Sequence, residues 1–107
     1  MKTLTERTRR LGLHLSFDVS GKDAGGTPFT QTARTLNISG GGVLFESARH
    51  LLVGSRLVLH IQIPPALRKH FGSRPLYRVR AVVCRVERFQ DEAMSRVGAR
   101  FLGEIRD

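Results

Sequence analysis

Residues 11–20 have the sequence LGLHLSFDVS, in which apolar side chains alternate with small or polar ones at every position. Because successive side chains of a strand point to opposite sides, this pattern predicts a β-strand with one buried face. The buried face is formed by Leu11, Leu13, Leu15, Phe17 and Val19. The rest of the chain repeats this character in shorter segments.

Five later segments are predicted to be strands, and turn-forming residues separate them. The expected strands span residues 29–36, 43–46, 57–63, 77–89 and 96–102. Glycine, proline and small polar residues in the intervening stretches are typical of turns. Six short antiparallel strands without a long helical repeat predict an all-β protein, either a small barrel or a sandwich.

Two local features modify this pattern. Pro64 and Pro65 end the fourth predicted strand, and residues 66–71 are expected to form a short helical turn before Gly72. In the fifth strand the apolar positions change from one face to the other at residues 81–84. A bulge or bend is therefore predicted there, as strands that close a barrel often need one.

Composition favours one compact domain with affinity for anions. A chain of 107 residues fits a single domain with a buried core. Lys and Arg number 18 against 9 Asp and Glu, so the formal net charge is +9. Such a surface attracts anionic ligands, and salt weakens the attraction. The single cysteine excludes an intramolecular disulfide framework, and no apolar run is long enough for a membrane span, so a cytoplasmic protein is expected.

Residues that carry enzyme chemistry are few and scattered. The four histidines have no metal-ligand spacing, and the carboxylates are better explained as partners of the arginines than as an acid–base pair. Neither a metal site nor an enzyme is expected. Cys84 lies in an apolar stretch, which predicts a buried, inert thiol. Residues 68–88 are basic, but the few aromatic residues there mostly fit the core pattern, so nucleic acid is not expected as a partner.

The segment Asn37-Ile38-Ser39-Gly40-Gly41-Gly42 connects the second and third predicted strands. Glycines let a backbone approach a ligand closely, and amide or hydroxyl groups can bind a base edge or a phosphate oxygen. By itself the segment is explained as a tight turn. Arg7, Arg9 and Arg10 change this balance, because a guanidinium pairs with phosphate and stacks on flat rings. The combination predicts a site for an anionic, nucleotide-like ligand.

In these features the chain resembles the PilZ family, bacterial domains whose members typically bind the second messenger cyclic di-GMP. The family pattern is Arg-x-x-x-Arg in an N-terminal arm, followed after a strand hairpin by [Asp/Asn]-x-Ser-x-x-Gly. Asn37, Ser39 and Gly42 match the second motif. The resemblance implies a six-stranded antiparallel β-barrel of PilZ type over residues 11–107, preceded by a flexible basic arm at residues 1–10.

The resemblance also implies a function without catalysis or a cofactor. It assigns cyclic di-GMP binding to Arg7, Arg9, Arg10, Asn37, Ser39, Gly41 and Gly42. The arginines would clamp phosphates and stack on guanines, Asn37 would bind a guanine edge, and Ser39 would contact phosphate or ribose. Gly42 would permit the turn. Ordering of the arm on the ligand would then alter the surface presented to a protein partner or a fused effector domain.

The first motif departs from the family pattern. Arg7 and Arg10 are separated by one residue fewer than the pattern has, and Glu6 stands four residues before Arg10. A carboxylate in the place of an arginine repels phosphate. A second interpretation is therefore a degenerate PilZ-like protein-interaction module that does not bind cyclic di-GMP, and a third is a basic nucleic-acid binder.

Overall fold

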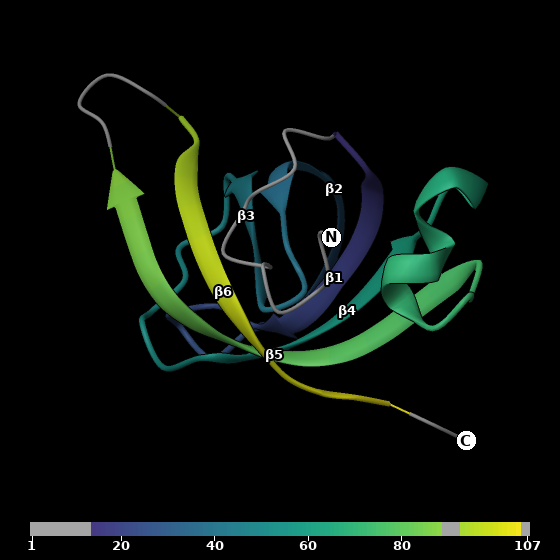
Figure 1. Cartoon of the computed structure of the whole chain (residues 1–107). Coiled ribbons are helices and arrows are strands. Elements are labelled where there is room, and N and C mark those ends of the chain that lie inside the picture. The colour runs from purple at the N-terminus through teal and green to yellow at the C-terminus, as the bar shows by residue number, and fades with distance from the viewer. Residues whose placement is uncertain (1–13, 89–92, 106–107) are drawn as a thin grey trace.

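The computed structural model describes residues 14–88 and 93–105. Within these residues six strands close into a barrel in the order β1-β2-β3-β6-β5-β4, and all neighbouring strands are antiparallel (Figure 1). The strands are β1 (Ser16–Lys22), β2 (Pro28–Ile38), β3 (Gly42–Ser47), β4 (Arg56–Gln62), β5 (Leu76–Arg88) and β6 (Ser95–Glu104). The predicted all-β class and six-stranded antiparallel barrel are confirmed.

Two pairings between strands distant in sequence close the barrel. β3 pairs with β6, and β1 pairs with β4, where Phe17 lies opposite Ile61. The other four pairings join strands that follow one another along the chain. Closure gives each strand a hydrogen-bonded neighbour on both sides, which protects the backbone from pairing with other chains.

The start of the first strand is only partly visible. Residues 11–13 of the predicted strand lie outside the described residues, and the first ladder pair joins Ser16 to Arg34. Leu15 is nevertheless already fixed against β2. Its backbone N–H donates to Thr35 Oγ1 at 2.9 Å, and the Thr35 N–H donates to the Leu15 carbonyl at 2.9 Å. Phe89, the last residue of the strand predicted at residues 77–89, also falls outside the described part.

The core follows directly from the alternation in the sequence. Phe17 and Val19 of β1 are buried, and the residues between them face solvent. The Phe17 and Phe45 rings meet edge to face, with their centroids 5.1 Å apart, a favoured aromatic geometry. Strands β4 and β5 continue the same layer with alternate aliphatic residues. The buried set includes Leu57, Leu59, Ile61, Val79, Ala81, Val83, Val97 and Ala99.

Three register shifts interrupt the alternation. One lies between Thr35 and Asn37 of β2, and two lie in the β5–β6 pairing, at Arg80/Ala81 and Val83/Arg85. The bulge predicted at residues 81–84 is therefore confirmed. The second β5 shift also overturns the prediction for Cys84, which is exposed rather than buried. An extra residue in the strand leaves both Cys84 and Arg85 facing solvent.

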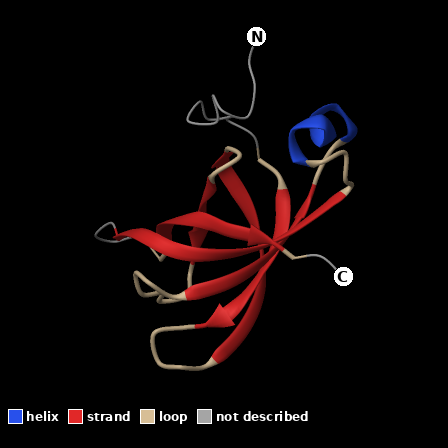
Figure 2. Cartoon of the chain, turned by 60° about the horizontal axis from the view of Figure 1, so that its bottom comes forward, coloured by secondary structure: helices blue, strands red, loops and turns tan. Residues whose placement is uncertain are grey.

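The predicted helical turn is a 3₁₀ helix, η2 (Pro65–Phe71), which lies outside the barrel wall between β4 and β5 (Figure 2). Proline at its first turn costs no hydrogen bond, and Gly72 ends it in the left-handed region with φ 71°. Phe71 is buried and contacts Tyr77, with 5.2 Å between ring centroids. Among residues 14–88 and 93–105, no helix has the length and apolar character needed to cross a membrane.

Candidate ligand-binding pocket

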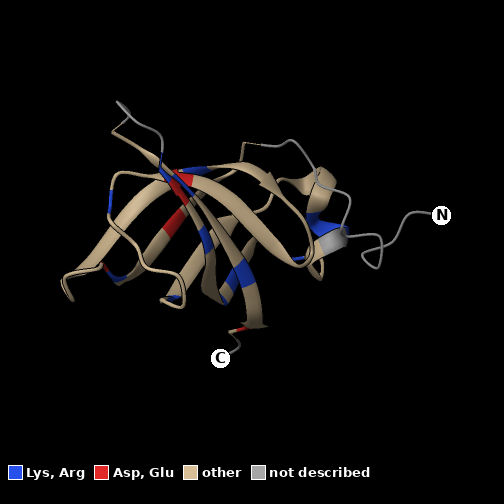
Figure 3. Cartoon of the chain, turned by 90° about the vertical axis from the view of Figure 1, so that its left-hand side faces the viewer, with Lys and Arg blue, Asp and Glu red and all other residues tan. Residues whose placement is uncertain are grey.

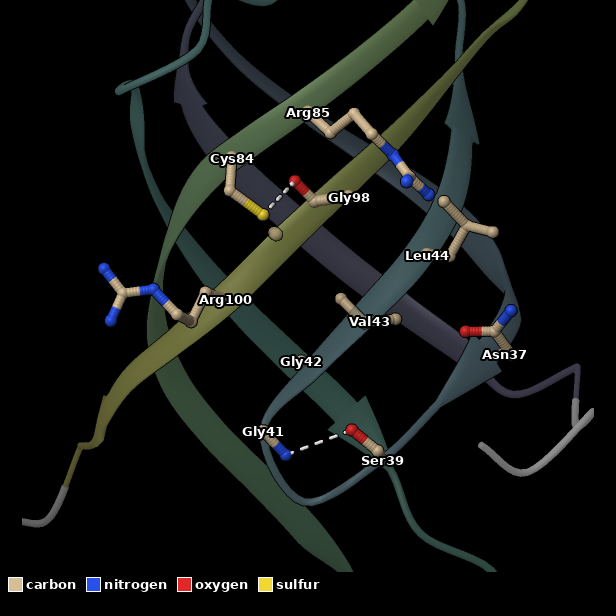
Figure 4. A pocket seen from close by; sticks show the side chains of 11 residues that line it. Asn37, Ser39, Gly41, Gly42, Val43, Leu44, Cys84, Arg85, Gly98 and Arg100 are labelled. Atoms are coloured by element: carbon tan, nitrogen blue, oxygen red, sulfur yellow. Dashed lines mark hydrogen bonds between the residues drawn. The ribbon is translucent and has the colours of Figure 1, made fainter. Parts of the chain in front are cut away.

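A pocket of about 490 Å³ lies on the outer surface of the barrel over β3, β6 and β5 (Figure 4). The turn between β2 and β3 forms one end of it, and β5 forms the opposite wall. Its lining residues are Asn37, Ser39, Gly41, Gly42, Val43, Leu44, Cys84, Arg85, Gly98, Ala99 and Arg100. The pocket thus joins one contiguous segment, residues 37–44, to two strands that come much later in the chain.

Glycine at two strand positions shapes the pocket. Gly98 of β6 lies between Leu44 of β3 and Arg85 of β5 in the sheet. Because Gly98 has no side chain, the outer surface of the sheet is recessed at this position. At Gly42 the reason for glycine is close packing, since a Cβ there would come within 2.6 Å of the Ala99 carbonyl oxygen.

The structure changes the expected role of Gly42. The described glycines with positive φ are Gly26, Gly54 and Gly72, so Gly42 needs no left-handed backbone conformation to form the turn. Instead it allows β3 to approach β6, where it pairs directly with Arg100. The motif glycine therefore acts through the distance between two strands.

Hydrogen bonds fix the turn at Ser39. The Gly41 N–H donates to Ser39 Oγ at 3.2 Å, and the Ser39 N–H donates to the Gly42 carbonyl at 2.9 Å. The turn is also tied to β6, because the Phe101 N–H donates to the Gly41 carbonyl at 2.9 Å. A hydroxyl group has one donor and two acceptor positions, so Ser39 can hold the turn and still donate to a ligand.

Asn37 reaches the pocket because of the bulge in β2. Thr35 pairs with Phe45 and Asn37 with Leu44, so the strand contains one residue more than its partner. Thr35 is buried, whereas Asn37 is only half-buried and lines the pocket. Within the described part of the chain, the Asn37 amide makes no hydrogen bond, and both its donor and acceptor atoms remain available.

The pocket is electrostatically positive. Arg85 and Arg100 are both exposed, and neither forms an ion pair or hydrogen bond with any other described residue. No acidic side chain is among the described residues that line the pocket. The ion pairs recorded for the described residues, Arg49–Asp23 and Arg74–Glu104, involve none of the lining residues. Figure 3 shows Lys and Arg on several strands of the barrel, with Asp and Glu positions among them.

Two further observations on the described residues concern metal ligands and titratable groups. No group of three or more His, Cys, Asp or Glu residues within 14–88 and 93–105 is arranged to hold a metal ion. The half-buried Tyr77 phenol has a raised pKa, chiefly because of burial, with Glu104 raising it further and Arg74 lowering it. Tyr77 does not line the pocket.

The model of the PilZ domain family matches residues 5–107 of the sequence. The chain belongs to the PilZ domain family. PilZ domains are binding domains rather than enzymes, and they generally act as cyclic di-GMP receptors. A comparison with curated proteins finds no match.

A solved structure shares this PilZ architecture. The structure of the Bacillus subtilis inhibitor of motility, MotI/DgrA, superimposes with a TM-score of 0.64 at 20% sequence identity. The match covers 90% of this chain but only 41% of the other, so the present chain spans less than half the length of that protein. At this identity the similarity shows the fold alone.

The PilZ pocket brings together part of the predicted site. Asn37, Ser39, Gly41 and Gly42 all line it, whereas Arg7, Arg9 and Arg10 lie outside the described residues. Sequence reasoning missed Gly98, Arg85 and Arg100. The change of face at residues 81–84 was the available signal for Arg85, because a bulge there alters the direction of the following side chain.

Proposed function

We propose that this PilZ domain is a cyclic di-GMP receptor and that the pocket over β3, β6 and β5 is its binding site. The observation that carries the proposal is the convergence of Asn37, Ser39, Gly41 and Gly42 on one positive pocket of about 490 Å³. A volume of several hundred cubic ångströms suits a small-molecule ligand. In this proposal residues 1–10 form a basic arm, and residues 11–107 form a single barrel domain.

Each polar group in the pocket has a distinct task in the proposal. The Asn37 amide donates to and accepts from a guanine edge, since its side chain makes no hydrogen bond with another described residue. Ser39 donates its hydroxyl proton to a phosphate or ribose oxygen while its oxygen holds Gly41. The arginines of the arm, Arg7, Arg9 and Arg10, clamp phosphate and stack on guanine rings.

Signalling follows from ordering of the arm. A ligand shifts a conformational equilibrium only if it binds one state more tightly than the other. Cyclic di-GMP does so here by contacting both the arm and the pocket, which favours the state with the arm ordered. A cytoplasmic protein partner, or an effector domain fused to this one, then meets a changed surface.

Isothermal titration calorimetry with cyclic di-GMP tests the proposal. Wild type is expected to bind in a saturable manner, and linear GMP dinucleotide and a short DNA duplex serve as controls. Ser39→Ala and Arg10→Ala should each weaken binding by more than about 1 kcal/mol, the scale of a charge-assisted hydrogen bond. Ser39→Thr is the matched control because it keeps the hydroxyl. Wild-type affinity in both alanine variants would show that the site is wrongly assigned.

The second candidate is a PilZ protein-interaction module without a ligand. The spacing of Arg7 and Arg10, together with Glu6, favours it because the arm lacks the full arginine motif. A folded wild-type protein that releases no heat with cyclic di-GMP would support this candidate. Binding to the DNA duplex alone, with a steep salt dependence, would instead indicate a nucleic-acid binder.

A further inference from the structure

We propose that Arg85 of β5 and Arg100 of β6 form a phosphate-binding wall of the pocket, on strands other than those that carry the segment Asn37–Gly42. The inference rests on the proposed function, because it assigns one phosphate of the ligand to this wall. Both residues line the pocket, and both lie outside the Asn37–Gly42 segment and the arginine arm. They come from strands that the sequence motifs do not include.

The bulge in β5 is the first observation that supports the wall. Val79, Ala81 and Val83 are buried at alternate positions, so uninterrupted alternation would direct residue 85 toward the core. The register shift between Val83 and Arg85 instead leaves Arg85 exposed, directly opposite Gly98. Bulges beside functional sites often re-aim a side chain in this way.

The second observation is the free space between the arginines and the turn. Gly98 has Leu44 on one side and Arg85 on the other, and a Cβ at Gly98 would make an ordinary contact of 3.6 Å with the Arg85 Cβ. In Figure 4 the Arg85 side chain extends across β6 toward Leu44. Because Gly98 has no side chain, no side chain of β6 lies between Arg85 and Leu44 in this row of paired residues.

Arg100 lies on β6, beside the segment that carries the motif. It pairs directly with Gly42, and paired strands lie about 5 Å apart. Its side chain extends away from the turn in Figure 4, but it is exposed and has no partner among the described residues. Two uncommitted guanidinium groups in a pocket without a lining carboxylate form a favourable place for an anion.

The chemistry of the ligand fits two separate cationic groups. A cyclic dinucleotide carries two phosphodiesters on opposite sides of one ring. The arginine arm can hold one of them, and Arg85 and Arg100 can each approach the other from their own strand. The wall thereby offsets the incomplete arginine spacing of the arm at Arg7 and Arg10.

The test is calorimetry with cyclic di-GMP on Arg85→Ala and Arg100→Ala. Each substitution should raise the Kd about tenfold or more, because each removes a charge-assisted contact. Arg80→Ala is the matched control: Arg80 is exposed on the same strand, does not line the pocket, and should leave the Kd within about twofold. Wild-type affinity in both pocket variants, with binding lost in Ser39→Ala, would overturn the wall while leaving the proposed function intact.

A second measurement tests the phosphate-binding wall, and it does not require that wild type bind cyclic di-GMP. Cys84 is the single cysteine, it is exposed, and it lines the pocket, so its alkylation by neutral iodoacetamide reports occupancy. Inorganic pyrophosphate should slow this alkylation in wild type and in Arg80→Ala but not in Arg85→Ala. Comparing rates with and without pyrophosphate within each variant removes any change in intrinsic thiol reactivity. Equal protection in all variants, or none in wild type, would overturn the wall.

Discussion

At the scale of single residues, Gly42 belongs to the sequence motif and is also required where β3 packs closely against β6. A Cβ there would lie 2.6 Å from the Ala99 carbonyl oxygen, a contact with rigid backbone that side-chain rotation cannot relieve. We expect Gly42→Ala to lower the free energy of unfolding by about 1–3 kcal/mol, the usual cost of overpacking. Urea denaturation measures the change.

Gly98→Ala is the matched control for this prediction. The added Cβ would make only ordinary contacts, 3.6 Å from Arg85 Cβ and 4.0 Å from Cys84 Sγ. Its free energy of unfolding should stay within about 0.5 kcal/mol of wild type, as for most surface substitutions. Equal destabilisation by both substitutions would mean that loss of glycine in the strand, rather than the contact with Ala99, determines the cost.

The residues of the candidate pocket form two groups. A local sequence pattern identifies the first group, and only strand pairing brings the second group to the pocket. Asn37, Ser39, Gly41 and Gly42 lie within one short segment, and the nearby arginines together with the resemblance to the PilZ motif identified them. Gly98, Arg85 and Arg100 enter only through strand pairing, which no local pattern specifies. The wrong expectation for Cys84 has the same cause: the bulge was predicted, but its exact position decides which side chains face solvent.

At the scale of elements, a chain of aromatic rings attaches η2 to the barrel. Tyr77 contacts Phe71 on one side and Phe101 on the other, with ring centroids 5.2 and 5.7 Å apart. Burial raises the pKa of the Tyr77 phenol above its ordinary value of 10.0. Above about pH 10 the unfolded chain therefore loses its proton first, and the free energy of unfolding falls as pH rises.

We expect Tyr77→Phe to retain the ring contacts and to remove this contribution to alkaline destabilisation. Below pH 10 the two proteins should have similar Tm values, and above it the Tm of wild type should fall more steeply. Tyr77 is the single tyrosine of the chain, and there is no tryptophan, so tyrosinate absorbance titrates it directly. A midpoint at or below 10.0 in the folded protein would contradict the expected direction.

The strands were predicted most accurately where the alternation of apolar and polar residues extends over many positions. β4 follows strict alternation and was predicted nearly to its ends, whereas β1 alternates only as far as Val19 and extends two residues beyond its predicted end, to Lys22. The short segment 43–46 was predicted two residues shorter than β3 (Gly42–Ser47), because Gly42 gives no apolar signal. Sequence also could not specify that η2 would be 3₁₀ rather than α-helical, since so short a helix shows only about two turns of periodicity.

At the scale of the whole molecule, stability depends on one shared core. Phe45 is fully buried and packs edge to face against Phe17 on a non-adjacent strand. Phe45→Ala should cost about 3–5 kcal/mol, a large part of the 5–15 kcal/mol typical of a small domain. Thermal unfolding should show a markedly lower Tm. Val53→Ala, at a site that is 65% exposed, should change Tm little.

The backbone hydrogen bonds between β1 and β4 close the barrel, and they do not depend on the side chains that face outward. Most residues of the core and most residues of the pocket therefore occupy different positions of the same strands, although Val43 and Ala99 belong to both sets and Gly42 of the pocket also permits the close packing of β3 against β6. In evolutionary terms, a few substitutions on the outer face can alter, redirect or abolish ligand binding while the barrel still folds. A PilZ barrel that loses its messenger thus persists as a stable protein, open to selection for other contacts.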